Sequence, residues 1–262
     1  MNQNYHLILL FAWIGIGLVL FPFLLRITAP YGRHLHGKWG PLIPNRLGWM
    51  IMEVWALVGV SYWFWTGITP KSQGAYFIYG LYFVHYTYRS LVFPFLTHTS
   101  GKKMPLLIAV AALFFNTANT FFIGSALGNA GGQVPKMGSP LLWIGLAIFI
   151  SGAFIHLRSD AILIGLRKPG EKGYFIPRGF LFRFVSCPNL FGEMVEWAGF
   201  ALMIGSFIPG NAGEWFVFLS GWSFALWTGV NLIPRALQHH AWYLKTFPDY
   251  PKERKAFIPF IW

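Results

Sequence analysis

The stretch from His156 to Trp197 concentrates side chains that could do chemistry. It contains six cations, Arg158, Arg167, Lys168, Lys172, Arg178 and Arg183, but only two acids, Asp160 and Glu171, before the next apolar run, where Glu193 and Glu196 follow. Six cations in one short segment favour an anionic partner, such as a phosphate or a lipid headgroup. Positive charge beside an apolar run is also an ordinary sign of membrane topology. Headgroup binding, however, requires neither Tyr174 and Asn189 nor the carboxylates Glu193 and Glu196, so the segment is a candidate ligand site.

The composition is that of a membrane protein. Hydrophobic residues make up 55% of the 262 residues and charged residues only 11%, which is more apolar surface than one soluble core can bury. Seven runs approach the ~20 residues that a helix needs to cross a bilayer: residues 7–27, 47–64, 75–95, 104–126, 140–156, 190–207 and 215–232. The short alternating strands of a membrane barrel are absent from the sequence. We therefore expect an all-α integral membrane protein, a seven-transmembrane-helix bundle, with residues 1–262 forming a single domain.

The distribution of basic residues predicts the orientation of this bundle. Most of the 20 lysines and arginines fall in the first, third and fifth connections and in the tail, whereas the opposite set of connections contains only Lys71 and Lys136. By the positive-inside rule the N-terminus then lies outside and the C-terminus in the cytoplasm. Residues 157–189 and 233–262 would form a cytoplasmic loop and tail. The net charge of +12 thus reflects topology, and we expect no nucleic-acid partner.

Several polar residues fall inside the predicted spans. Glu53 is costly to keep ionised in hydrocarbon, so a functional site facing the bundle interior is the default interpretation; an acid reaching the interface near Arg46 is the alternative. In the third span, His85, Tyr86, Tyr88 and Arg89 point to different faces of a helix. Asn116 and Asn119 share one face, which is typical of interhelical hydrogen bonding.

The tail carries a polar helical face. Arg235, His239 and Tyr243 recur every four residues and therefore lie on one side of a helix, where they could face a ligand or lipid headgroups. His239 and His240 are adjacent and would diverge, and Cys187 is the single cysteine. We therefore expect no metal site and no intrachain disulfide.

Four segments together resemble one enzyme family. They are HYTYRS in the third span, RSDAILIGLRKPGEKGYFIP, NLFGEMVEW and RALQHHAWYLKTFPDYPKERKAFIPFIW. These segments are similar to the steroid 5α-reductases, membrane enzymes that use NADPH to reduce the Δ4 double bond of 3-oxo-steroids. The resemblance implies a seven-helix bundle whose cofactor is reached from the cytoplasm. It suggests a bacterial or other non-vertebrate member, in a bacterial inner membrane or the endoplasmic reticulum.

The resemblance also assigns roles to residues. It implies that Glu53 and Tyr86 bind the steroid carbonyl. The NADPH contacts it implies are Asp160, Arg167, Tyr174, Asn189, Glu193, Arg235, His239 and Tyr243, with Tyr31 and Trp49 as further candidates. This chain departs from the vertebrate pattern at three positions: His156 stands where vertebrate members have asparagine, Phe175 where they have arginine, and Met52 where they have glutamine. The missing arginine bears on the preference for NADPH over NADH, and Met52 bears on steroid specificity.

These assignments define a reaction. Hydride can add to the β-carbon of an enone, C5 of the steroid, only if negative charge can move onto the carbonyl oxygen, with a proton then added at C4. A protonated Glu53 and the Tyr86 phenol would stabilise that oxygen, as a tyrosine and a protonated aspartate do in ketosteroid isomerase. One alternative is reduction of a non-steroid enone or enoyl lipid. Another is an S-adenosylmethionine-dependent methyltransferase of the isoprenylcysteine carboxyl type, which the many cations disfavour because that cofactor carries no phosphate.

Overall fold

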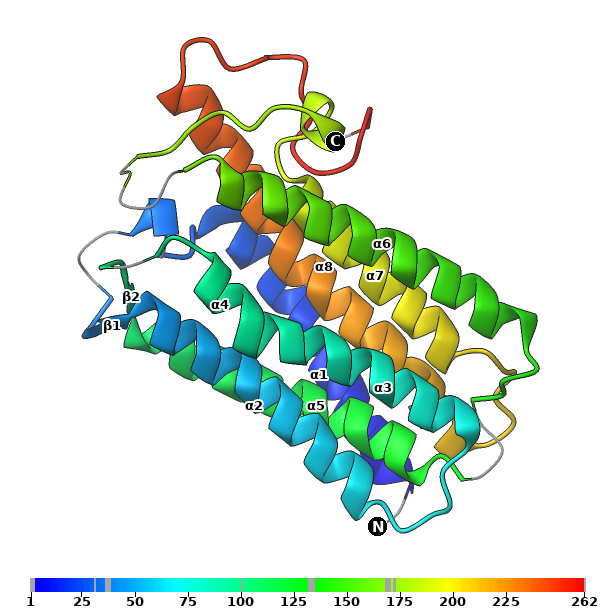
Figure 1. The fold of residues 1–262 in the computed structure, drawn as a ribbon. Helices are drawn as coiled ribbons and strands as arrows, with labels where there is room; N and C mark the ends of the chain where they lie inside the picture. Colours follow the sequence, from blue (N-terminus) through cyan, green and yellow to red (C-terminus); the bar gives the residue numbers. More distant parts are fainter. Residues whose placement is uncertain are drawn as a thin grey trace.

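A bundle of long helices makes up most of the protein. The computed structural model describes residues 3–30, 32–35, 39–99, 101–131, 135–167, 171 and 173–261. Five helices are long and apolar enough to cross a membrane: α1 (Gln3–Arg26), α2 (Asn45–Thr66), α5 (Leu106–Asn129), α6 (Pro140–Gly165) and α8 (Ala212–Thr246). They run along one another in Figure 1, which confirms the helical class.

The other two predicted runs are also helical but shorter or interrupted. α3 (Gln73–Thr87) continues through a π-helical turn, η2 (Tyr88–Val92), into α4 (Phe93–Leu96), and α7 spans Pro188–Ile204. Figure 1 places the two ends of the chain at opposite ends of the bundle. The count of seven spans and the direction in which the bundle is inserted stay predictions.

Two helices continue beyond the apolar runs that predicted them. α6 extends past His156 to Gly165, and α8 extends past Leu232, through Pro234, to Thr246. In α6 the added residues include Ser159 and Asp160, both buried. Hydropathy marks where apolar side chains stop, but a helix continues wherever neighbouring elements satisfy its polar side chains. His156 and Asp160 therefore lie one turn apart on the same helix.

One end of the bundle gathers segments that are distant in sequence. β1 (Leu42–Pro44) pairs antiparallel with β2 (Lys103–Pro105) just before α2 and α5 begin. On the same side, η1 (Gly32–His34), η3 (Phe180–Arg183) and the C-terminal segment lie near the ends of α6 and α8 (Figure 1). Val185 forms a parallel bridge with Lys255. The predicted loop and tail are thus in contact.

Asparagines hold helices together inside the bundle. The Asn116 side-chain amide on α5 donates to the Met52 carbonyl on α2 at 2.9 Å. Asn119, one turn on, accepts from the indole N–H of Trp13 on α1 at 3.1 Å. This confirms the interhelical role predicted for the pair and fixes the backbone immediately before Glu53.

Glycines bring α6 and α7 into close contact. A methyl group at Gly192 would lie 2.5 Å from the backbone nitrogen of His156, and one at Gly199 would lie 2.6 Å from the Gly145 carbonyl oxygen. Small residues permit such approach in membrane helices, where packing rather than water release drives association. The contact places His156 of α6 opposite the turn of α7 that carries Glu196.

Gly192→Ala should therefore separate the two helices. Overpacking of this kind costs about 1–3 kcal/mol, so we expect a lower thermal unfolding midpoint in detergent. Gly15→Ala in α1 is the matched control, because a methyl group at that position would have nothing within 4 Å of it. Equal midpoints for the two variants would contradict the close packing.

Candidate functional site

Asp160 is the hub of a buried polar centre between α3, α6 and α7. Its Oδ1 accepts a hydrogen bond from the side-chain amide of Asn189 at 3.0 Å. Its Oδ2 lies 3.2 Å from His156 Nε2 and 3.5 Å from Arg89 Nη1. Of the residues predicted to contact the cofactor, Asp160 and Asn189 are thus directly bonded to each other.

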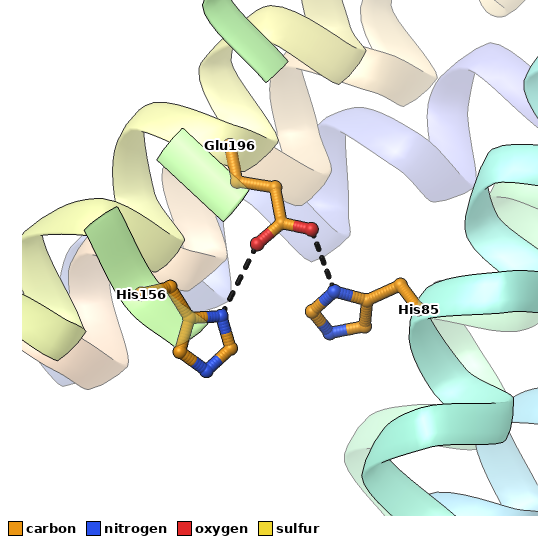
Figure 2. A group of neighbouring side chains, drawn as sticks. All are labelled: His85, His156 and Glu196. Atoms are coloured by element: carbon orange, nitrogen blue, oxygen red, sulfur yellow. Dashed lines mark hydrogen bonds and ion pairs between the residues drawn. The ribbon is translucent and has the colours of Figure 1, made fainter. Parts of the chain in front are cut away.

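Glu196 forms the second half of this centre. Its Oε1 lies 2.7 Å from His85 Nδ1, and its Oε2 lies 3.2 Å from His156 Nδ1. Figure 2 shows the carboxylate between the two imidazole rings. The side chains of Glu196 and His156 are each only 2% exposed, so these interactions are shielded from water.

Glu53 and Tyr86 reach the same interior from α2 and α3. Glu53 interacts electrostatically with Arg89, Glu193 and Arg235, and Tyr86 interacts with Glu53 and Glu193. The Tyr86 ring is nearly buried and stacks on Tyr82 with centroids 4.4 Å apart. The structure therefore brings together the two residues predicted to bind a carbonyl, with Glu193 beside them.

The π-helical turn at the end of α3 positions Arg89. Such turns widen a helix locally and often occur at functional sites. Here the Ser90 hydroxyl donates to the Tyr86 carbonyl at 2.6 Å. The Arg89 guanidinium lies 5.1 Å from the Trp49 ring centroid, which joins Trp49 to the polar centre.

A second group forms where the loop after α6 meets η1 and the residue that precedes β2. Three cations approach the Tyr174 ring: Arg33 at 5.2 Å, Lys102 at 5.2 Å and Arg167 at 5.6 Å. Burial, and then the charges of Arg167 and Arg33, lower the pKa of Lys102. Cations this close repel one another, so an anion placed among them would be bound favourably.

The predicted face of α8 borders both groups. The Arg33 guanidinium lies 4.8 Å from the Tyr243 ring centroid, and His239 Nδ1 is hydrogen-bonded to His34 Nε2 at 2.9 Å. Arg235 interacts electrostatically with Glu53 and His239, linking the end of the bundle to its interior. Tyr31 lies outside the described residues.

The adjacent histidines of α8 diverge, as predicted. Whereas His239 turns to His34, His240 Nδ1 lies 2.6 Å from the Ser186 hydroxyl. Ser186 also bonds the Tyr250 hydroxyl at 2.7 Å. His240 thus anchors the tail.

The fold places in the site several residues that received no individual cofactor- or substrate-binding role from the sequence: Arg33, His34, His85, Arg89, His156 and Glu196. Each is a polar residue inside or beside a predicted span. That is a usable signal, because an intramembrane ionisable group is a functional candidate by default. Their partners come from other helices, and spacing in the chain could not identify them.

A helical bundle with apolar outer faces and a charged interior defines a membrane protein with an internal polar site. Comparison with known proteins identifies the family within this class. Residues 102–262 match the family model described as 3-oxo-5-alpha-steroid 4-dehydrogenase. Human 3-oxo-5-alpha-steroid 4-dehydrogenase 1 is 35% identical over 250 residues, covering 94% of this chain and 92% of the human protein.

Plant proteins match as well. The steroid 5-alpha-reductase DET2 of Gossypium hirsutum is 36% identical over 244 residues, or 90% of this chain and 89% of the cotton protein. The Arabidopsis thaliana DET2 protein is 35% identical over 248 residues, or 90% and 88% of the two chains. The chain therefore belongs to the steroid 5-alpha-reductase family of oxidoreductases, as its motifs predicted.

Proposed function

We propose that this protein uses NADPH to reduce the Δ4 double bond of 3-oxo-Δ4-steroids, giving 5α-reduced 3-oxo-steroids. Membership of the family supports the reaction class. The observation that carries the proposal is the convergence of Glu53 and Tyr86 from separate helices in one electrostatic cluster inside the bundle. The protein would act within a membrane, taking a flat, lipophilic enone from the surrounding lipid.

The two residues would act on the carbonyl oxygen. Glu53 as a neutral acid and Tyr86 as a phenol each supply one O–H donor. Donors fixed in a buried site stabilise developing negative charge without the reorganisation that water would need. The stacking of Tyr86 on Tyr82 and the bond from Asn116 to the Met52 carbonyl hold both side chains in place.

The polar residues at the end of the bundle fit a phosphate-bearing cofactor. The three cations around Tyr174 provide the charge. Arg33 Nη1 and Trp49 Nε1 are buried donors with no hydrogen-bond partner among the residues that the structure describes. When bound, NADPH supplies the hydride. Arg167 and Arg235 would hold its phosphates, while Asp160, Asn189, Glu193, His239 and Tyr243 would orient it, with Trp49 and Tyr31 as further contacts.

Glu53→Gln and Tyr86→Phe should each lower kcat by about 10²–10³-fold, because each weakens a donor at the oxygen that becomes charged. NADPH binding should be nearly unchanged. The measurement is steroid-dependent NADPH oxidation, followed by absorbance with purified protein. Tyr88→Phe is the control, because it removes one phenolic hydroxyl from a tyrosine two residues away. Normal turnover in both site variants would exclude the assigned pair.

Arg167→Ala and Arg235→Ala should raise the KM for NADPH much more than they change kcat, because phosphate contacts are equal in the ground and transition states. The loss of a charge-assisted bond predicts an increase of about ten- to hundredfold. The same substitution at the exposed Lys252 is the control. If Arg167→Ala and Lys252→Ala behave alike, the loop cations serve topology and not the cofactor.

NADPH binding should weaken as pH rises through the pKa of Lys102 in the free protein. That pKa is lowered by burial and by Arg167 and Arg33; bound phosphate would raise it, so binding takes up a proton over this range. Calorimetry in buffers of different ionisation enthalpy measures the uptake. Lys102→Met should abolish it, and an unchanged uptake in that variant would refute the assignment.

A further inference from the structure

His156 contacts two different carboxylates through its two ring nitrogens. Nε2 lies 3.2 Å from Asp160 Oδ2 on the same helix, and Nδ1 lies 3.2 Å from Glu196 Oε2 on α7. The ring has 2% of its surface exposed, so water is not an alternative partner. Each carboxylate also has a second partner: Asp160 is hydrogen-bonded to Asn189, and Glu196 is hydrogen-bonded to His85.

These contacts determine the protonation of His156. An ionised carboxylate only accepts hydrogen bonds, and a neutral imidazole has a single N–H to donate. Two carboxylate partners therefore require N–H groups at both nitrogens, which makes the ring an imidazolium. Its positive charge offsets two buried acids that would otherwise repel each other in a medium of low polarity.

The imidazolium also joins two parts of the site. One end of the chain of bonds is Asn189 and Asp160, which the proposed function assigns to the dinucleotide. The other end is His85, whose ring centroid lies 5.1 Å from that of Tyr86. His156 connects these two ends, because its ring contacts Asp160 on α6 and Glu196 on α7. The close glycine packing of α6 against α7 makes this connection possible.

We propose that His156 is a positioning residue: as an imidazolium between Asp160 and Glu196 it fixes the dinucleotide side of the site relative to Tyr86 and Glu53. The inference rests on the proposed function for what the two sides bind. Ligand atoms of His85, His156 and Glu196 also lie within 4.8 Å of one another, as metal ligands do. A doubly protonated His156 has no lone pair for a metal, however, so hydrogen bonding accounts for the cluster.

The test compares His156→Gln with the double variant His156→Gln/Glu196→Gln. In the single variant the one amide group can donate to only one carboxylate, and its oxygen faces the other. In the double variant, the amide at position 196 can donate to the amide at position 156 and accept from His85, while the amide at position 156 donates to Asp160. The double variant therefore restores a complete, charge-balanced set of bonds, although amides do not relay protons. His98→Gln, in the connection between α4 and β2, is the matched control.

We expect His156→Gln to raise the KM for NADPH and to lower kcat by at least about tenfold each, since an uncompensated buried charge is strongly unfavourable. The double variant should recover both constants to within about threefold of the wild type. A double variant that folds but stays inactive would overturn the proposal in favour of a proton relay or a metal site, and equimolar metal in the purified protein would identify the latter. A lower unfolding midpoint with unchanged kinetics would show a structural role only.

The unfolding midpoints of the wild type, His156→Gln, Glu196→Gln and the double variant form a double-mutant cycle, which reports coupling between positions 156 and 196 without any substrate. If the wild type fails to reduce steroids, the proposed function fails, while the cycle still decides whether the two side chains are charge partners. If His156→Gln does not fold, the double variant alone decides: kinetics near wild type support the positioning role, and an inactive folded protein refutes it.

Discussion

A buried carboxylate in a membrane bundle needs partners, because neither water nor lipid can solvate its charge. Asp160 meets this constraint through Asn189, His156 and Arg89, and each partner comes from a different place in the chain. Satisfying one acid thus fixes the start of α7, one turn of α6 and the π-helical end of α3 relative to one another. Glu196 and its two histidines continue the same pattern of acids held by basic groups.

Helix packing makes this arrangement possible. Gly192 lies against the backbone of His156, and Gly152 lies against that of Glu196. Without Cβ atoms at these positions the helix axes approach closely, and short polar side chains can then meet between them. Close packing and buried charge are therefore linked: the glycines bring the acids and histidines within bonding distance, and those bonds in turn hold the helices in register.

The two polar groups differ in how their charge is balanced. Inside the bundle, Asp160 and Glu196 have cationic or imidazole partners in the structure itself. Around Tyr174 the cations Arg33, Lys102 and Arg167 crowd one ring, and burial together with the charges of Arg167 and Arg33 lowers the pKa of Lys102. The first group balances its own charges, whereas the second, in the function proposed above, would accept negative charge from a ligand. Such a division would suit an oxidoreductase that combines the proposed anionic cofactor with a neutral, lipophilic substrate.

Local sequence was enough to predict the class of the protein. Apolar run lengths predict helices, and seven such runs coincide with helical segments because backbone groups in hydrocarbon must bond within their own helix. Local motifs also predict the family, and the i, i+4 spacing of Arg235, His239 and Tyr243 places these residues on one face. These properties depend only on residues that are close together in the chain, and their order can be read from the sequence.

Which charges meet, in contrast, is visible only in the folded bundle. Nothing in the spacing of His85, His156 and Glu196 relates them, since they lie on α3, α6 and α7. Hydropathy likewise ended the fifth run at His156, although α6 continues to Gly165 because Asp160 finds its partners there. The pairing of buried polar groups depends on helix packing across the bundle, and so on distances that no periodicity in the chain encodes.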